Sequence, residues 1–359
     1  MRPFRKFLRD FMSSQRLLRG APLVGRLAEA EAILSRLVGE KQLPGMVVDV
    51  RKNGEKYFQK GFGNAHAKSK KVVDPGRTLF RAASASKPIA ATALGRMVEA
   101  GLIDLDASFY DYAPYFPKKK YDFTIRQLAS HTAGIRGYKG KEYALNRPYT
   151  IKDSLSIFKE DALLFPPGTS YHYNSYDWVL VSLAMEEASG IPFDEYVRKE
   201  VLIPLGMDHT KPEVPRDPDK YIAEFYTKTS SGFRKSTTVD NRYKLAGGGY
   251  LTTAADLSIL GQSYLTKTFL KPETYVEFLN PLTINGTSTY YGLGWEVSLD
   301  KSGNPYFGHT GNSIGGYSNF YIYPENDLVV SILINCTDPK VQAVLDEVIL
   351  IWLSAEPII

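Results

Sequence analysis

One stretch in the first third of the chain decides how the rest is organised. It reads Phe80-Arg81-Ala82-Ala83-Ser84-Ala85-Ser86-Lys87-Pro88-Ile89. Ser84 and Lys87 open a segment, residues 90–100, that is polar at only three positions and is therefore typical of a buried helix. Residues i and i+3 share one helix face, so the Lys87 amine can lie beside the Ser84 hydroxyl. We expect the remaining chain to form a scaffold around this pair.

The chemistry of the pair is that of an activated nucleophile. A serine hydroxyl needs a neighbouring base to take its proton. A free lysine, with a pKa of about 10.4, is a poor base near neutrality, but burial or a nearby cation lowers that pKa. Unpaired N–H groups at a helix N-terminus also favour an oxyanion. Ser-x-x-Lys is a short pattern, however, and we interpret its second copy, Ser156 with Lys159, as a coincidence.

Composition narrows the classes of function. The chain has 359 residues, enough for one large domain or two lobes. Its net charge of +5 is spread out, and the basic runs 68–71 and 118–120 are short, so we expect no nucleic-acid partner. Cys336 is the only cysteine and the five histidines lack metal-ligand spacing, so we expect neither an intrachain disulfide nor a metal site.

The N-terminal segment, residues 1–22, is basic and amphipathic. Residues 2–12 alternate cations with aromatic and aliphatic side chains and lack the uninterrupted apolar run of a secretory signal. They suit either contact with a membrane surface or a helix that is frayed or docked on the protein itself. We therefore expect a cytoplasmic or membrane-peripheral location rather than a periplasmic one.

Periodicity predicts an α+β fold in which an antiparallel sheet is flanked by helices and a mostly helical lobe is inserted. Asn53-Gly54 predicts a hairpin between strands 45–50 and 55–63. Further strands are expected at residues 290–297, 306–309, 317–323 and 328–334, and helices at 23–37, 177–188, 254–265 and 340–353. The expected domains are an α/β sheet domain, 23–80 with 245–359, and a helical lobe, 81–244, that carries Ser84.

Two further segments are candidates for the same site. Tyr173 precedes the expected helix 177–188, and its phenol would become a base only beside cations such as Lys87. By itself Tyr173 is one of 24 tyrosines, and packing would explain it. The run from His309 to Asn312 links two expected strands, and its glycine lets backbone approach a ligand closely.

In combination these segments carry a family resemblance. Ser84-x-x-Lys87, Tyr173-x-Ser175 and His309-Thr310-Gly311, in this order, resemble the motifs of the penicillin-recognising serine hydrolases. The likeness covers roughly residues 25 to 355 and is greatest to the class C β-lactamase-like group, which includes D-peptidases and esterases. Residues 130–138 and 239–249 are similar to its mitochondrial serine β-lactamase-like branch.

The resemblance implies a covalent acyl-enzyme mechanism on a peptide or ester bond, with no metal or organic cofactor. Ser84 would attack the carbonyl carbon, and Lys87 and Tyr173 would share the role of base. The implied substrate-binding and oxyanion residues are Ser175, His309, Thr310, Gly311 and Asn312, with the oxyanion held by the N–H groups of Ser84 and Asn312.

Two departures from the family pattern indicate a peptidase or esterase rather than an efficient β-lactamase. Ser175 stands where the class C lactamases carry Asn, and Asn174 comes one residue early. His309 stands where they carry Lys, and a histidine is mostly neutral at pH 7.

Two alternatives remain open. One is a non-catalytic or weakly catalytic assembly or binding protein, including a homo-oligomer, because one fold can host unrelated functions. The other is a D-Ala-D-Ala carboxypeptidase or weak β-lactamase, which would require export. The loops 137–149 and 217–242 are expected to set specificity.

Overall fold

The centre of the fold is a seven-stranded antiparallel sheet with the order β11-β12-β13-β14-β1-β2-β3. This computed structural model describes residues 23–354. The strands are β1 Gly45–Lys52, β2 Glu55–His66, β3 Lys71–Val72, β11 Glu296–Leu299, β12 Pro305–Ser313, β13 Gly316–Tyr323 and β14 Leu328–Ile334. β1 pairs with β14, so segments almost 300 residues apart form the middle of the sheet. The predicted α+β class is confirmed.

The first hairpin forms where Asn53-Gly54 predicted it. Both residues have positive φ, 53° and 77°, as a two-residue turn of the primed type requires. The turn matches the right-handed twist of the two strands it joins, so β1 and β2 pair along their length.

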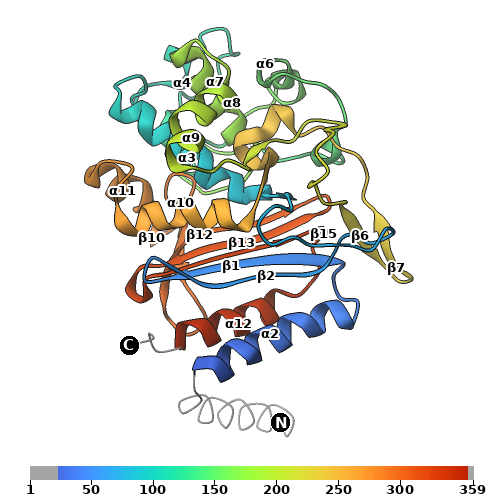
Figure 1. Ribbon diagram of the computed structural model, residues 1–359. Coiled ribbons are helices and arrows are strands. Elements are labelled where there is room, and N and C mark those ends of the chain that lie inside the picture. Colours follow the sequence, from blue (N-terminus) through green and yellow to red (C-terminus); the bar gives the residue numbers. More distant parts are fainter. Residues whose placement is uncertain (1–22, 355–359) are drawn as a thin grey trace, which may run out of the picture. The chain divides into compact units, whose positions relative to one another are not determined.

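Helices cover one face of the sheet and continue into the helical lobe (Figure 1). α10, Ala254–Thr266, contacts β1, β13 and β14, and α3, Ser86–Glu99, contacts β12 at the sheet and α7 and α8 in the lobe. α3 is nearly enclosed, as its small and apolar residues predicted. The other helices of this part are α4 Phe109–Tyr112, α5 Ile125–Ala129, α6 Ile151–Ser154, α7 Tyr176–Ser189, α8 Phe193–Val197, α9 Ile203–Leu205 and α11 Pro272–Leu279.

Three small sheets complete this part of the chain, and they have the strand orders β4-β8-β5, β15-β6-β7 and β10-β9. The first of them pairs β4 with β8 just before the Ser84 turn and so anchors that turn. The strands are β4 Phe80–Arg81, β5 Lys211–Pro212, β6 Tyr226–Thr229, β7 Gly232–Lys235, β8 Tyr250–Thr252, β9 Thr283–Ile284, β10 Thr287–Ser288 and β15 Cys336–Thr337.

The chain divides into two compact units. In the described residues one unit comprises 23–43 with 339–354, in which α2, Leu23–Gly39, packs against α12, Gln342–Ser354. The other comprises residues 44–338 and contains the sheet and the helical lobe. The predicted boundaries at residues 81 and 245 stay a prediction. Residues 1–22, including the expected membrane-contact segment 2–12, lie outside the described residues.

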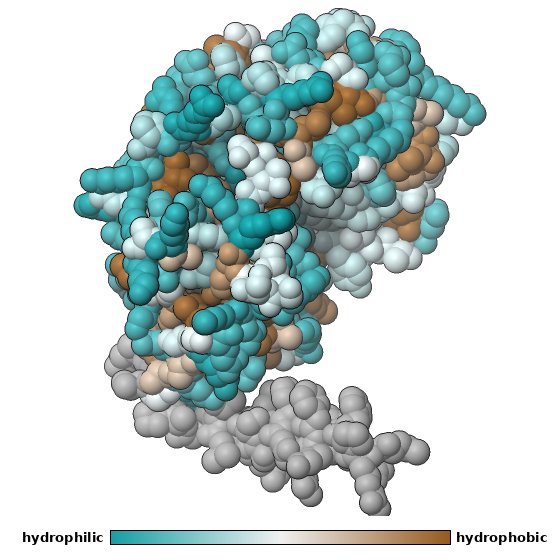
Figure 2. Space-filling model, turned by 90° about the vertical axis from the view of Figure 1, so that its right-hand side faces the viewer, coloured by the Kyte–Doolittle hydropathy of each residue, from teal (hydrophilic) through white to brown (hydrophobic). Residues whose placement is uncertain are grey.

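The surface carries a mixture of polar and apolar groups. In the view of Figure 2, hydrophilic side chains cover most of the face and hydrophobic groups form separate patches. Within residues 23–354, no helix combines the length and the hydropathy needed to cross a membrane.

The strand predicted at residues 290–297 is wrong over most of its length, since β11 begins only at Glu296. The preceding residues form a tight loop in which Tyr290 and Gly294 have positive φ, 55° and 82°. A Cβ at Gly294 would lie 2.6 Å from the Trp178 ring, so the backbone here is pressed against α7. This close approach, rather than strand pairing, explains the glycines.

Candidate active site

Ser84 lies in a single 3₁₀ turn, Ala83–Ala85, directly before α3. The turn packs closely against β12. The approach is so close that a Cβ added at Gly311 would lie only 2.9 Å from the Cβ of Ala83. Ala83 has φ 49°, a left-handed conformation that costs a non-glycine residue about 1–2 kcal/mol. The fold therefore holds the serine turn in an unfavourable backbone geometry between the sheet and α3.

Lys87, in the first turn of α3, is fully buried and contacts the serine. Its Nζ lies 3.3 Å from the Ser84 Oγ and 2.7 Å from the Tyr173 hydroxyl, and it donates to the carbonyl oxygen of Gly247 at 2.9 Å. Burial lowers the Lys87 pKa to about 7, against the opposing effect of the negative charges of Glu296 and Asp177. A large fraction of this amine is therefore neutral near pH 7 and able to accept a proton.

Tyr173 completes the group of three. Its hydroxyl lies 2.8 Å from the Ser84 Oγ, while the side chain as a whole is 39% exposed. We expected the neighbouring cation to lower the Tyr173 pKa, but burial of the phenol raises it above the ordinary value of 10. Tyr173 is thus a neutral phenol in the resting site, and the amine of Lys87 is the group available to accept a proton.

Asn174 and Ser175, the two residues that follow Tyr173, have different surroundings. Asn174 is buried, and its amide nitrogen donates to the carbonyl oxygens of Ile135 and His172 and to the carboxylate of Asp177. The amide nitrogen is thus used within the protein, and the amide oxygen accepts from the backbone N–H of Asp177. Ser175, the N-cap of α7, lines a cavity together with Ser84, and its role in substrate binding stays a prediction.

The third motif lies on β12, with His309 buried behind the strand. His309 Nδ1 lies 2.6 Å from the Thr310 carbonyl oxygen, which can only accept, so this nitrogen carries the proton. Nε2 then accepts from the Tyr291 hydroxyl at 3.0 Å. Burial lowers the His309 pKa to about 3. His309 is therefore neutral and supplies no cation to the site.

The other residues of the third motif, Thr310, Gly311 and Asn312, have different surroundings. The Thr310 hydroxyl lies 2.6 Å from the Tyr321 hydroxyl, and Gly311 gives β12 its close approach to the serine turn. Asn312 and Ser84, whose N–H groups are the predicted oxyanion donors, line the same two cavities. Their role as an oxyanion hole stays a prediction.

Ser84 is reached from two sides. One cavity, of about 300 Å³, is lined by Ser175 and by residues of both predicted specificity loops, among them Tyr138 and Asn241. The other, of about 460 Å³, has five tyrosines among its lining residues and contains Glu296, which was not predicted from the sequence as a site residue. We call these the loop cavity and the tyrosine cavity.

His131 and Asp177 form a buried pair next to the ring of Tyr173. Neither residue was predicted from the sequence as a functional candidate. His131 is fully buried, its Nδ1 lies 2.8 Å from the Asp177 carboxylate, and its ring centre lies 4.6 Å from that of Tyr173. His131 appeared in the sequence only as part of the family likeness. The structure shows that it packs against the ring whose hydroxyl touches Ser84.

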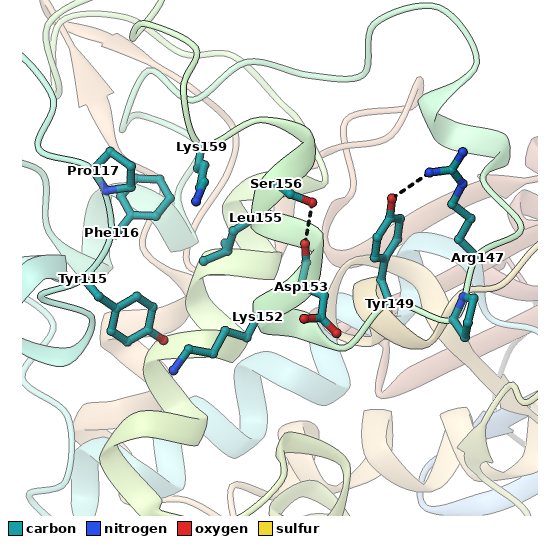
Figure 3. A pocket seen from close by; sticks show the side chains of 11 residues that line it. Tyr115, Phe116, Pro117, Arg147, Tyr149, Lys152, Asp153, Leu155, Ser156 and Lys159 are labelled. Carbon is teal, nitrogen blue, oxygen red and sulfur yellow. Dashed lines mark hydrogen bonds between the residues drawn. The ribbon is translucent and has the colours of Figure 1, made fainter.

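The second Ser-x-x-Lys copy has no comparable surroundings. Ser156 and Lys159 line a cavity of about 660 Å³ in the helical lobe (Figure 3). The Ser156 hydroxyl is exposed and donates to the carbonyl oxygen of Asp153. Across the described residues no hydrogen bond joins Ser156 to Lys159, so this copy lacks the contact and the burial that Ser84 and Lys87 have.

Fold and site together define a β-lactamase-like serine hydrolase architecture. The chain belongs to the Beta-lactamase family, which matches it over residues 30–351. Among particular relatives, the human mitochondrial serine beta-lactamase-like protein LACTB is 27% identical over 390 residues, covering 82% of this chain and 71% of that protein.

Solved structures share the fold. The D-amino acid amidase of Ochrobactrum anthropi SV3, in complex with D-phenylalanine, superposes with a TM-score of 0.80 at 20% identity, covering 91% of this chain and 98% of that one. The octameric penicillin-binding protein homologue of Pyrococcus abyssi gives a TM-score of 0.78 at 22% identity, covering 92% of this chain and 78% of that one.

Proposed function

We propose that this protein hydrolyses an ester or peptide-type amide bond through a covalent acyl-enzyme on Ser84. The observation that carries the proposal is the contact of Lys87 Nζ, 3.3 Å from the Ser84 Oγ, in a buried setting that brings the Lys87 pKa to about 7. A binding module has no chemical need for a buried amine with that pKa beside a serine.

The proposed reaction proceeds in two halves. Lys87 takes the Ser84 proton, either directly or through the Tyr173 hydroxyl, which lies 2.8 Å from Ser84 and 2.7 Å from Lys87. The Oγ attacks the carbonyl carbon, and the N–H groups of Ser84 and Asn312 hold the oxyanion. The proton then passes to the leaving group. Water, deprotonated by the same pair, cleaves the acyl-enzyme and regenerates Ser84.

An efficient β-lactamase activity is not part of the proposal. The cation that lactamases carry at the third motif is absent, because His309 is neutral. The amide of Asn174 is turned into the protein rather than towards the substrate. We therefore expect hydrolysis of p-nitrophenyl esters and amino acid amides to exceed that of nitrocefin.

A fluorophosphonate probe tests the nucleophile directly. We expect it to add to Ser84, as located by peptide mass spectrometry, and Ser84→Ala to abolish both labelling and ester hydrolysis. Ser156→Ala is the matched control, since Ser156 belongs to the second Ser-x-x-Lys copy and should leave both unchanged. Labelling that survives Ser84→Ala would refute the proposal.

We also propose that the chain forms a homo-oligomer, supported by its likeness to a homologue described as octameric. Multi-angle light scattering should then give a mass that is a multiple of 40.2 kDa. A mass equal to one chain at micromolar concentration would contradict it.

A further inference from the structure

The tyrosine cavity beside Ser84 contains a carboxylate that the proposed reaction does not use. Glu296, the first residue of β11, lines this cavity and its side chain is 27% exposed. One carboxylate oxygen accepts from the backbone N–H of Thr310 at 3.2 Å. The other lies 3.3 Å from Nδ1 of His309. These contacts fix the orientation of the carboxylate at the cavity wall.

Nothing in the described structure neutralises that charge by contact. His309 is neutral, because its Nδ1 proton goes to the Thr310 carbonyl oxygen and its Nε2 accepts from Tyr291. Lys87 makes its contacts with Ser84, Tyr173 and Gly247 instead. Within residues 23–354, no lysine or arginine forms an ion pair with Glu296.

The walls of the cavity suit a cation as well. Four tyrosines line it together with Glu296 and Tyr173, namely Tyr171, Tyr290, Tyr291 and Tyr306. The faces of aromatic rings attract ammonium groups, and the attraction grows when the cation is partly desolvated. A carboxylate with aromatic neighbours is a common solution for binding an amine, whereas it would repel a carboxylate.

We propose that the tyrosine cavity binds a positively charged ammonium group of the substrate, with Glu296 as its counter-ion. This inference rests on the proposed hydrolase function and narrows the substrate to esters or amides that carry an amine near the scissile bond. The family pattern places a lysine at position 309, so the cavity of this chain has the opposite charge preference to that of a lactamase.

Three p-nitrophenyl esters with the same spacer of three methylenes test the inference: 4-(trimethylammonio)butanoate, its neutral isostere 5,5-dimethylhexanoate and the anionic glutarate monoester. The assay is run at pH 8, because burial raises the Glu296 pKa to about 7 and the group is then mostly ionised. We expect kcat/KM to be roughly tenfold higher for the cationic than for the neutral ester, and lowest for the anionic ester.

Glu296→Gln should bring the cationic-to-neutral ratio close to one. Glu277→Gln is the matched control, since it removes one negative charge from an exposed side chain that pairs with Arg126, and it should keep the ratio. A wild-type ratio of one or less would overturn the inference. So would a ratio that survives Glu296→Gln or that falls equally in Glu277→Gln.

A second measurement separates this inference from the proposed function. If the wild type hydrolyses none of the esters and the fluorophosphonate probe does not label Ser84, the hydrolase proposal fails, and calorimetry then decides whether the cavity binds an ammonium group. The probes are the amides 4-(trimethylammonio)butanamide and 5,5-dimethylhexanamide, which a protein without hydrolase activity does not turn over. Tighter binding of the cationic amide that is lost in Glu296→Gln supports the ammonium site, whereas equal or no binding of both overturns it.

Discussion

The side-chain amine of Lys87 donates to the carbonyl oxygen of Gly247 at 2.9 Å, across 160 residues of sequence. This bond comes from the π-turn Leu245–Gly249, which follows the helical lobe, and not from the helix that carries Lys87. It points the amine at Ser84 and Tyr173. The Gly247 carbonyl oxygen is also an acceptor that never titrates. The contacts of the buried amine with Ser84 and Tyr173 therefore remain free for proton transfer.

Activity should depend on pH through Lys87. Because burial lowers its pKa to about 7, kcat/KM for a neutral ester should rise as the pH increases from 5 and level off above 8. The protonated amine below this pKa cannot accept the Ser84 proton. Lys87→Met should reduce kcat/KM by about 10²–10⁴. A profile that is flat from pH 5 to 8 in an active wild type would contradict this assignment.

Glu296 should shift that profile in a defined direction. Its negative charge raises the Lys87 pKa, so Glu296→Gln should move the inflection to lower pH. The same profile with the neutral ester, measured in both proteins, checks this. An inflection that disappears in Glu296→Gln would instead belong to the Glu296 carboxyl, whose own pKa is about 7.

The contact of Ser84, Lys87 and Tyr173 with one another could be expected from the sequence, because the family motifs that contain them are local. Ser84 and Lys87 are three residues apart, and Tyr173 lies in a short recognisable run. Glu296 could not be predicted in the same way. Its position in the site depends on the pairing of β11 with β12 and on a neutral His309, and both are long-range features.

The misassigned strand shows a related limit. The run from Tyr290 to Trp295 has the aromatic and apolar residues of a strand, and β-propensity cannot distinguish it from a packed loop. Contact with Trp178 of α7 decides the outcome, and only the tertiary structure brings these segments together. The hairpin at Asn53 was predicted correctly, because its turn conformation is determined by adjacent residues.

Gly311 should be intolerant of any side chain. A Cβ there would lie 2.8 Å from the Ala82 carbonyl oxygen and 2.9 Å from the Ala83 Cβ, so β12 would have to move away from the serine turn. We expect Gly311→Ala to destabilise the fold by about 1–3 kcal/mol and to reduce kcat/KM at least tenfold. Chemical denaturation and ester hydrolysis measure the two effects.

Gly76→Ala is the control for this substitution, since a Cβ at Gly76 would meet only the Asp74 carboxylate at an ordinary 3.6 Å. Gly76→Ala should change neither the free energy of unfolding nor kcat/KM by more than the experimental error. Full activity in Gly311→Ala would show that β12 and the serine turn can separate without consequence.

Arg81 should stabilise the region that supports Ser84. Its guanidinium donates to both Glu213 carboxylate oxygens, with Nε at 3.0 and 2.8 Å, and lies 4.1 Å from the ring centre of Phe225. It also donates to the carbonyl oxygen of Ile314, which follows β12. Both ion-pair partners are largely buried, at 5% and 12% exposure. We expect Arg81→Met to lower the free energy of unfolding by about 3–5 kcal/mol, because it leaves the Glu213 carboxylate without its main partner.

Lys235→Met provides the comparison for Arg81. Lys235 pairs with Glu224 at 3.3 Å but is 73% exposed, so water and salt screen the pair and its loss should cost about 0–1 kcal/mol. Urea denaturation of both variants measures the difference. Adding Glu213→Gln to Arg81→Met should recover part of the lost stability, because the uncompensated carboxylate is then removed. Equal losses in Arg81→Met and Lys235→Met would show that burial adds nothing to the Arg81 pair.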